Sequence, residues 1–460
     1  MSTYALTNAN TGKVEKTFDS LASSEIPGLI DTAHEAYLSW KNNSVAERAT
    51  VLAAVAKGFD ARKDELAEII GREMGKPHAD ALAEIQLVVD IFNWYATEGP
   101  AHLEDSPLNA KGAPVNFVRH DPLGVLLGVM PWNFPYYQLA RFTAPNLLVG
   151  NTVLMKQASI CPVSSAAFEE VLLEANLPKG AYQNLYLNTE DVEHILKDFR
   201  VKGVSVTGSE RAGAAVAELA AQNLKKSVME LGGNDPAIVL ADVENVGKVA
   251  ETLAGLRFSN AGQVCTSPKR IIVVEDIYDE FVEAAKTAVE NFVVGDADDP
   301  KTQMGPLSSE SARDDAVERI EQAVKDGATL HAGGKKLDRP GWFMSPALLT
   351  DVDFDDNLSC NELFGPALVV YKVKDEAAAI EFANASEYGL QASVWTADMD
   401  HGLEVADQIE AGMVLVNEHV VTQADLPFGG INKSGYGREL TQWGLLEFTN
   451  EKLIRATKLS

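Results

Sequence analysis

Two side chains in this 460-residue chain could together make and break bonds at a carbonyl carbon. Cys265 lies in the stretch SNAGQVCT, and Glu230 lies earlier, in the stretch MELGG. A thiolate attacks carbonyl groups at neutral pH, and the resulting thioester is hydrolysed when a carboxylate activates water. A lone cysteine is more often a small buried apolar residue, so this hypothesis needs support from further motifs.

A side-chain amide follows an apolar segment that is typical of a strand. Asn133 lies in the pentapeptide PWNFP, directly after Gly124–Met130. The NH2 group of Asn can donate to an oxyanion without adding a charge that would hold a thiolate too tightly. The alternative is an Asn that fixes a proline-flanked turn. Together with Cys265, Asn133 would provide the oxyanion site that attack on a carbonyl requires.

A third motif is suited to phosphate groups. The segment Gly203–Val206 is typical of a strand, Thr207-Gly208-Ser209 is typical of a turn, and a helix with Gly213 near its start follows. Free N–H groups at a helix N-terminus, together with the helix dipole, favour phosphate oxygens at such a turn. The Gly-x-Gly-x-x-Gly pattern of ordinary dinucleotide-binding proteins is absent, so a plain strand-to-helix connection is the alternative.

Two further short segments are compatible with a nucleotide. LMKQAS carries Lys156 and Ser159 at the end of a predicted strand, and NELFGP contains Glu362 and Phe364. Taken alone, Lys156 is equally well explained as a solvated cation, and the second segment as an ordinary turn.

In this order the motifs resemble those of the aldehyde dehydrogenase superfamily. The resemblance covers essentially the whole chain and includes the later segments PFGG (427–430) and GRE (437–439). It implies that Cys265 is the nucleophile, that Glu230 activates water, and that Asn133 and the Cys265 N–H stabilise the oxyanion. It also implies a nicotinamide cofactor, NADP or NAD, and no metal. The residues expected to bind the cofactor are Trp132, Lys156, Ser159, Gly208, Ser209, Leu231, Glu362 and Phe364.

Ser159 bears on the choice between the two cofactors. Many NAD-preferring relatives have Glu at this position, where a carboxylate accepts from the ribose hydroxyls but would repel a 2′-phosphate. Ser removes that repulsion and Lys156 adds positive charge, so we expect NADP to be accepted. Gln157 replaces the Pro that is usual in the family, which affects the shape of the loop.

Arg141 bears on the class of aldehyde. Its spacing from Asn133 places both residues on about the same side of a helix. In the bacterial succinate-semialdehyde dehydrogenases, which the chain resembles, an Arg at this position binds the distal carboxylate, for which a guanidinium is suited. The alternative is a structural ion pair with one of the many acidic residues. We expect Phe428 and either Thr422 or Gln423 to complete the substrate site.

Two positions depart from the family pattern. Some succinate-semialdehyde dehydrogenases carry a second Arg where this chain has Ser259, and Arg257 is offset to another face of its predicted helix. Phe142 replaces a Lys that many relatives have after the Arg141 position. The expected reaction is NAD(P)-dependent oxidation of succinate semialdehyde to succinate. The alternatives are glutarate semialdehyde or a general aliphatic aldehyde as substrate, a CoA-acylating enzyme, which Glu230 disfavours, and an inactive scaffold, which the three catalytic candidates disfavour.

The elements that must position these residues are typical of an α/β fold. After a short opening segment, we predict helices over the first hundred residues, with a capping box at Ser44–Glu47. Short apolar strands alternate with helices from Asn151 to Val239, which predicts a doubly wound parallel sheet, and a second α/β unit follows from Asn245 to Val416. Residues Gly112–Met130 are predicted to form an extended hairpin that leads into a strand.

The resemblance completes the division into domains. We expect a variant Rossmann cofactor domain (1–111 and 123–232), an α/β catalytic domain (233–432) and a small β oligomerisation arm (112–122 and 433–460). In this family the subunits are closed by pairing of the C-terminal segment, here 447–459, with the 112–121 segment. This implies a homodimer or a homotetramer.

Composition limits the partners and the compartment. Asp and Glu (67) exceed Lys and Arg (39), and the net charge of −28 disfavours unassisted binding to nucleic acid or anionic membranes. Cys161, Cys265 and Cys360 are widely separated, which predicts neither a disulfide framework nor a Cys-x-x-Cys site. Met1–Gly12 lacks the pattern of a secretory signal, and the longest apolar run, Leu123–Met130, is too short to span a bilayer. We expect a cytoplasmic enzyme whose partner is a small aldehyde.

We predict that Ser159→Glu lowers kcat/KM for NADP more than for NAD. A carboxylate beside the 2′-phosphate repels it by about 1 kcal/mol in a partly screened site. Steady-state kinetics with both cofactors measure the effect. An unchanged ratio of the two kcat/KM values would show that this loop does not lie at the 2′ position.

Overall fold

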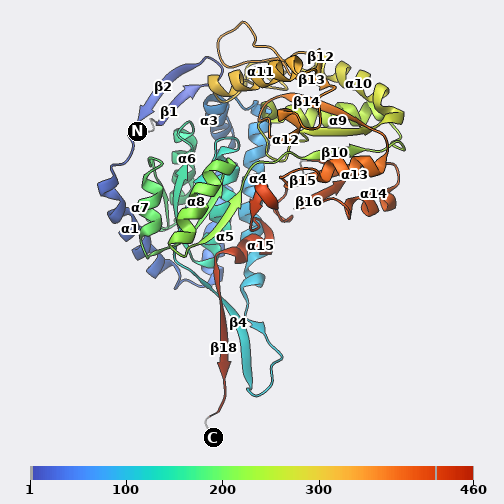
Figure 1. Cartoon of the computed structure of the whole chain (residues 1–460). Helices are drawn as coiled ribbons and strands as arrows, with labels where there is room; N and C mark the ends of the chain where they lie inside the picture. The colour runs from blue at the N-terminus through green and yellow to red at the C-terminus, as the bar shows by residue number, and fades with distance from the viewer. Residues whose placement is uncertain (1–3, 420–421, 459–460) are drawn as a thin grey trace.

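The computed structural model describes residues 4–419 and 422–458. Two α/β units lie side by side, and a narrow β arm projects from one of them (Figure 1). The fold class predicted from the sequence is confirmed. None of the helices in the described ranges is long and apolar enough to cross a bilayer.

The first unit is built on a six-stranded sheet. Its strands are β5 (Val125–Met130), β6 (Thr152–Gln157), β7 (Tyr182–Asn184), β8 (Val201–Thr207), β9 (Lys226–Glu230) and β17 (Gly435–Tyr436). Their order is β17-β9-β8-β5-β6-β7, and all neighbours are parallel except β17 and β9. The chain adds β6 and β7 on one side of β5 and then β8 and β9 on the other. The strand order therefore reverses beside β5, which opens a crevice at the carboxyl ends of β5 and β8.

Helices cover both faces of this sheet because side chains of successive strand residues point to opposite faces. Val125 and Leu127 pack in the core with α1, α7 and α8, whereas Leu126 packs in the core with α2–α6. Ser44 caps α2 as predicted, since its hydroxyl accepts from the Glu47 N–H (3.2 Å) and the Glu47 carboxylate accepts from the Ser44 N–H (2.7 Å). The helices are α1 (Ile26–Trp40), α2 (Val45–Ala61), α3 (Lys63–Met74), α4 (His78–Thr97), α5 (Pro135–Val149), α6 (Pro162–Glu174), α7 (Asp191–Lys197) and α8 (Glu210–Gln222).

The second unit is built on a seven-stranded sheet. Its strands are β10 (Pro236–Val239), β11 (Arg270–Val274), β12 (Thr329–Ala332), β13 (Ala347–Thr350), β14 (Ala367–Val373), β15 (Gln391–Trp395) and β16 (Met413–Val416). The order is β12-β13-β14-β11-β10-β15-β16, and only β12 and β13 are antiparallel. Its helices are α9 (Val246–Phe258), α10 (Glu275–Glu290), α11 (Glu310–Lys325), α12 (Asn357–Cys360), α13 (Glu376–Asn384) and α14 (Met399–Ala406).

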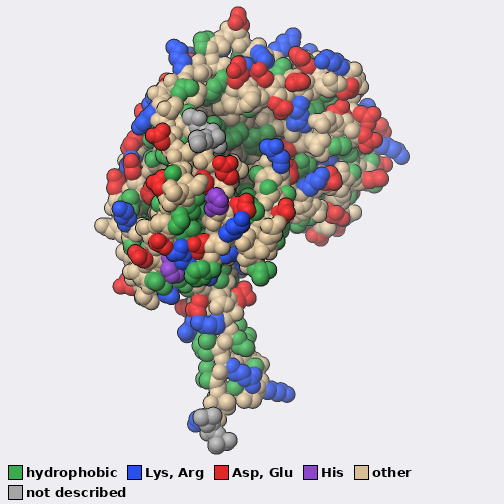
Figure 2. Space-filling model, turned by 60° about the vertical axis from the view of Figure 1, so that its left-hand side comes forward, with side chains coloured by type: hydrophobic (Ala, Val, Ile, Leu, Met, Phe, Trp, Pro, Cys, Tyr) green, Lys and Arg blue, Asp and Glu red, His purple; other side chains and the backbone are tan. Residues whose placement is uncertain are grey.

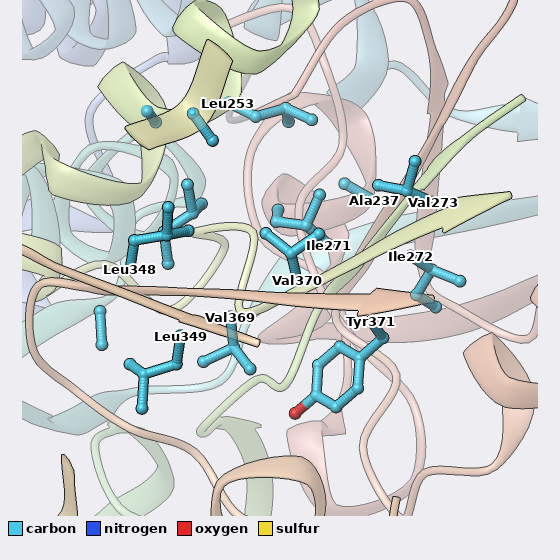
Figure 3. Close-up of a cluster of buried hydrophobic side chains, with 14 of the residues drawn as sticks. Ala237, Leu253, Ile271, Ile272, Val273, Leu348, Leu349, Val369, Val370 and Tyr371 are labelled. Carbon is cyan, nitrogen blue, oxygen red and sulfur yellow. The ribbon is translucent and has the colours of Figure 1, made fainter. Parts of the chain in front are cut away.

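Strand side chains and helix side chains form the core of the second unit (Figure 3). Ile271 of β11 is the register partner of Val370 of β14, and Val369 is the partner of Leu349 of β13. Neighbouring residues on one strand, such as Val369 and Val370, are both buried because helices cover both faces of a parallel sheet. This rigid sheet carries the loop that contains Cys265.

The arm brings together segments that are distant in sequence. β18 (Thr449–Ala456) pairs antiparallel with β4 (Val115–Pro122), which also pairs with β3 (Ser106–Pro107). The structure thus places the C-terminal segment beside residues 115–122, and the arm stands clear of the body (Figure 2). Val115 (40%) and Leu453 (59%) are exposed there.

One local prediction was wrong. β4 and β5 do not form a hairpin, because they belong to different sheets. The chain changes direction at Gly124, whose φ of +143° is a conformation that other residues rarely adopt. The short opening segment, for which no structure was predicted, forms an antiparallel pair of β1 (Tyr4–Asn8) and β2 (Lys13–Phe18). The remaining short elements are η1 (Ser23–Glu25), η2 (Gly99–Leu103), η3 (Ser259–Gly262), η4 (Asn432–Ser434) and α15 (Thr441–Glu447).

Candidate active site

A cavity of about 260 Å³ lies at the carboxyl edge of the six-stranded sheet, where loops of the second unit meet it. Segments that follow β5, β8 and β9 form one wall, and loops around Cys265 and Glu362 form the other. The crevice is therefore at the position where doubly wound sheets bind ligands. Most of the predicted catalytic and cofactor-binding residues line it, namely Trp132, Asn133, Gly208, Ser209, Leu231, Cys265, Glu362 and Phe364.

Cys265 lies directly after a strained turn, residues 260–263, which begins within η3. Asn260 and Ala261 have left-handed backbone conformations (φ +51° and +56°), and Gly262 follows at +75°. A Cβ atom on Gly262 would lie 2.3 Å from the carbonyl oxygen of Gly365, so only glycine permits this approach. The turn that carries the nucleophile is thereby packed directly against the segment that carries Glu362.

A buried arginine, Arg257, donates hydrogen bonds to this turn and to the neighbouring loops. The Arg257 guanidinium donates to Gly262 O (3.2 Å), Ser267 Oγ (2.7 Å) and Leu363 O (2.8 Å). Arg257 therefore supports the turn, a role that its sequence pattern did not indicate. Its three acceptors lie outside α9, in segments that follow this helix in the chain.

The Cys265 thiol is partly accessible from the cavity. The densely packed protein around it nevertheless raises the pKa of the Cys265 thiol to about 12, because burial disfavours the thiolate. Lys269 and then Arg141 lower this pKa by their positive charges. Formation of the nucleophile therefore depends on the charges placed around this turn.

Asn133 is hydrogen-bonded to the turn that carries Cys265. Its Nδ2 donates to Gln263 O (3.1 Å), and Asn260 Nδ2 donates to Asn133 O (2.9 Å). Asn133 is buried but contributes to the cavity wall together with Cys265. An amide donor and the predicted nucleophile thus face one space, which is the arrangement that an oxyanion site needs.

Glu230 occupies the end of β9 and is only 2% exposed. Neither carboxylate oxygen has a hydrogen-bond partner within the described chain, and Glu230 is not among the residues that line the cavity. Burial raises the pKa of Glu230 well above its usual range, and the positive charge of Arg141 opposes that shift. A Cβ on Gly429 would lie 2.8 Å from Glu230 Oε1, so the carboxyl group lies behind the glycine-rich PFGG segment.

Arg141 lies on α5 and forms a buried ion pair with Glu439. Its guanidinium also donates to Tyr137 Oη (3.0 Å) and Thr207 Oγ1 (3.0 Å) and lies over the Phe428 ring (4.6 Å to the centroid). It is 1% exposed and does not line the cavities around Cys265. Arg141 therefore forms the structural ion pair that the sequence analysis gave as the alternative. The pair is buried and does not line either cavity.

A second cavity, of about 280 Å³, reaches Cys265 as well. Phe428 and Thr422 line it, as expected of substrate-binding residues, whereas Gln423 is exposed and does not. Gln138 lines both cavities and donates a long hydrogen bond to Asn133 Oδ1 (3.5 Å). The two cavities meet at Gln138 and Cys265, which gives a cofactor and an aldehyde separate approaches to the thiol.

The residues expected to bind the cofactor fit a nucleotide phosphate. Lys156 is half-buried, burial lowers its pKa, and it has no ion-pair partner among the described residues. An unpaired, partly desolvated cation in a chain of net charge −28 indicates a site for an anion. Ser159 lies three residues further on, carries a neutral hydroxyl group and is also half-buried. These two residues lie outside the 260 Å³ cavity wall.

The remaining predicted residues frame the inner end of the same site. Trp132 and Phe364 pack edge to face (5.7 Å between centroids), and Ser209 caps α8 by accepting from the Ala212 N–H (3.4 Å). Gly208 N–H donates to Glu230 O (3.0 Å). Glu362 forms an ion pair with Lys269 (3.0 Å), a residue that none of the sequence motifs contained.

The chain matches the aldehyde dehydrogenase family over residues 2–454 and belongs to that family. A succinate-semialdehyde dehydrogenase [NADP(+)] of Deinococcus radiodurans is 48% identical over 453 residues, which cover 98% of this chain and 94% of the relative. A succinic semialdehyde dehydrogenase from Streptococcus pyogenes, solved in complex with NADP+, has a TM-score of 0.96 at 40% identity and covers 99% of this chain and 100% of its own. An NAD-dependent aldehyde dehydrogenase from Sinorhizobium meliloti has a TM-score of 0.95 at 30% identity, with 99% and 91% covered.

We predict that Cys265→Ala abolishes aldehyde oxidation, whereas Glu230→Gln permits about one equivalent of reduced cofactor per site and then stalls at the thioester. Rapid-mixing absorbance measurements of the reduced cofactor separate the two outcomes. Cys360→Ser is the matched control, because Cys360 is exposed and outside both cavities. Full steady-state turnover by Glu230→Gln at neutral pH would exclude the hydrolytic role of Glu230.

The raised pKa of Glu230 predicts a pH dependence of thioester hydrolysis. Only the ionised carboxylate can take a proton from water, so hydrolysis should accelerate as the pH rises through the raised pKa of Glu230. The rate of the steady-state phase, measured after the first turnover, reports this step. In Glu230→Gln the residual rate should lose this rise, and an unchanged pH profile would contradict the assignment.

Proposed function

We propose that this protein oxidises succinate semialdehyde to succinate, with NADP or NAD as the cofactor. One observation carries the proposal: Cys265 and the amide of Asn133 face a cavity lined by residues expected to bind a dinucleotide, in a chain 48% identical to a succinate-semialdehyde dehydrogenase [NADP(+)]. The unpaired Lys156 next to Ser159 supports acceptance of NADP. The NAD-dependent relative supports keeping NAD as an alternative cofactor.

The proposed mechanism has two stages. The Cys265 thiolate adds to the aldehyde carbon, and Asn133 Nδ2 and the Cys265 N–H donate to the oxygen that takes up the negative charge. The nicotinamide, when bound, supplies a hydride acceptor. The carbonyl carbon is then held as a thioester on Cys265. Glu230 takes a proton from a water molecule that attacks this carbon, which releases the carboxylic acid and the Cys265 thiol.

Neighbouring residues position Asn133 relative to Cys265 and set the pKa of Glu230. The hydrogen bonds between Asn133 and the turn 260–263 fix the distance between the amide donor and the nucleophile. Burial raises the pKa of Glu230, and its carboxylate, once ionised, is therefore a stronger base toward water. Arg141 keeps that pKa from rising further by its nearby positive charge.

We propose that the distal carboxylate of the substrate binds in the 280 Å³ cavity, at the wall formed by Tyr137 and Thr422. Arg141 lies behind this wall, and its guanidinium donates to the Tyr137 hydroxyl. The Tyr137 hydroxyl can in turn donate to a carboxylate, so positive charge would reach the substrate through Tyr137. In this proposal Arg141 sets the preference for an anionic aldehyde without itself lining the cavity.

We also propose that the arm joins copies of this chain into a homodimer or homotetramer. Exposed apolar residues on β4 and β18, such as Val115 and Leu453, support an interface there. The domain boundaries and the cytoplasmic location stay predictions. The separate six- and seven-stranded sheets support the boundary near residue 233, whereas β17, predicted in the arm segment 433–460, pairs with the six-stranded sheet.

We predict that succinate semialdehyde exceeds butyraldehyde in kcat/KM by about ten- to a hundredfold, because a charge-assisted contact contributes about 1.5–3 kcal/mol. Arg141→Ala should remove most of this ratio, and Arg141→Lys should retain part of it. Steady-state kinetics with both aldehydes measure the ratio, which does not depend on the fraction of folded enzyme.

The control for Arg141→Ala is the double variant Arg141→Ala/Glu439→Gln, because removing Arg141 alone leaves the Glu439 carboxylate buried without its partner. Both variants should lose the preference for the anionic aldehyde. Equal kcat/KM values for the two aldehydes in the unmodified enzyme would leave a general aldehyde dehydrogenase.

A further inference from the structure

Lys269 lies buried beneath the turn that carries Cys265, and its side chain is 2% exposed. Its ammonium group donates to Val264 O (2.9 Å) and Cys265 O (2.5 Å), and a longer contact reaches Ser267 O (3.4 Å). The fourth neighbour is Glu362 Oε1 at 3.0 Å. One lysine thus connects the nucleophile turn with the carboxylate that we expect to bind the cofactor.

Burial shifts the pKa values of two further ionisable groups near Lys269 toward their neutral forms. Asp235 is buried, neither of its carboxyl oxygens has a hydrogen-bond partner in the described chain, and burial raises its pKa to about 8. His419 is buried, donates to or accepts from Ser393 Oγ (2.7 Å), and burial lowers its pKa to about 3. Lys269 and Glu362 form the ion pair that adjoins the Cys265 segment, and Arg141 is the second positive charge that acts on the thiol.

We propose that Lys269 is a positioning residue for the nucleophile, which anchors the carbonyls of the turn and supplies the positive charge that stabilises the Cys265 thiolate, with Glu362 as its counter-ion. This inference rests on the proposed role of Cys265 as nucleophile. An ammonium in a site with little water acts strongly on a neighbouring anion, because the protein interior screens charges less than water does. Lys269 is also the largest of the charges that lower the pKa of the Cys265 thiol, whereas Glu362 and Asp235 raise it.

The alternative is a lysine that only ties the turn together. Carbonyl contacts alone would serve that purpose, and the reactivity of Cys265 would then not depend on the sign of the charge at position 269. The neighbouring Arg257 illustrates that purely structural arrangement, because its guanidinium contacts carbonyl and hydroxyl oxygens and has no carboxylate partner in the described chain. The Glu362 carboxylate distinguishes Lys269 from it.

The test measures the thiol itself, without aldehyde or cofactor. The full-length protein is alkylated with iodoacetamide over a pH series, and mass spectrometry of the Cys265 peptide gives the rate at each pH. We expect Lys269→Met to move the midpoint of this profile upward by about one pH unit, which lowers the rate about tenfold at pH values below the midpoint. Cys360 is exposed and serves as an internal reference, so its profile should not change in this variant.

Two further variants separate charge from structure. Glu362→Gln should move the Cys265 midpoint downward, because it removes a negative charge and leaves the Lys269 ammonium in place, and Lys269→Arg should restore most of the Lys269→Met effect. A general loosening of the turn cannot move the midpoint in opposite directions in Lys269→Met and Glu362→Gln. Thermal unfolding of each variant shows whether it is folded.

An unchanged midpoint in folded Lys269→Met, or shifts of the same sign in both variants, would overturn the proposal. If Lys269→Met does not fold, a midpoint in Glu362→Gln that stays in place or rises overturns it. The result is independent of the substrate assignment, because the absence of activity toward succinate semialdehyde would leave the alkylation profiles unaffected.

Discussion

The contact between Asn133 and the turn 260–263 is the interaction on which the site depends. Asn133 follows the central strand of the first unit, and the turn belongs to the second unit, so the two hydrogen bonds between them join the units at the cavity. The same contact brings the amide donor and Cys265 to one surface. The backbone of this turn is strained, because Asn260 and Ala261 have left-handed conformations. Arg257 donates to Gly262 O within the turn, and Lys269 donates to the carbonyls of Val264 and Cys265 directly after it.

Buried charges give the site its electrostatic character. The chain has a large excess of acidic residues, yet Lys156 is partly buried, and Arg141 and Lys269 are fully buried. Burial disfavours the charged forms of Cys265 and Glu230, and the neighbouring positive charges oppose that effect. Two opposing effects therefore set the pKa values of the Cys265 thiol and the Glu230 carboxyl group: desolvation raises them and nearby cations lower them. A single substitution of one of these cations can change that balance.

Arg141 shows how one side chain can belong to two networks. Its ion pair with Glu439 spans from α5 to the C-terminal segment, and its hydrogen bond to Tyr137 reaches the wall of the cavity. The pair holds the guanidinium in place, because the Glu439 carboxylate compensates the buried positive charge of Arg141. Recognition of a carboxylate by this protein would then pass through Tyr137, with the charge held at a distance from the substrate.

The sequence by itself determined the family and the fold class, because both depend on local patterns. The motifs around Asn133, Glu230 and Cys265 occur in family order, and alternating strands and helices predict a doubly wound parallel sheet. The capping box at Ser44–Glu47 was predictable for the same reason, since its partners are three residues apart. The roles of the individual site residues stay predictions, but the cavity contains most of them.

Only the tertiary structure decided the contacts between distant segments. No local pattern could show that Arg141 pairs with Glu439, because hundreds of residues separate them and many other carboxylates were available. The sequence did not indicate Gln138, because its position between two cavities depends on the tertiary fold. It did not indicate Lys269, because the partner of Lys269, Glu362, belongs to a different loop. The 112–130 segment was misassigned as a hairpin for the same physical reason, since the pairing of β4 with the C-terminal strand is non-local and a strand's own sequence does not specify its partner.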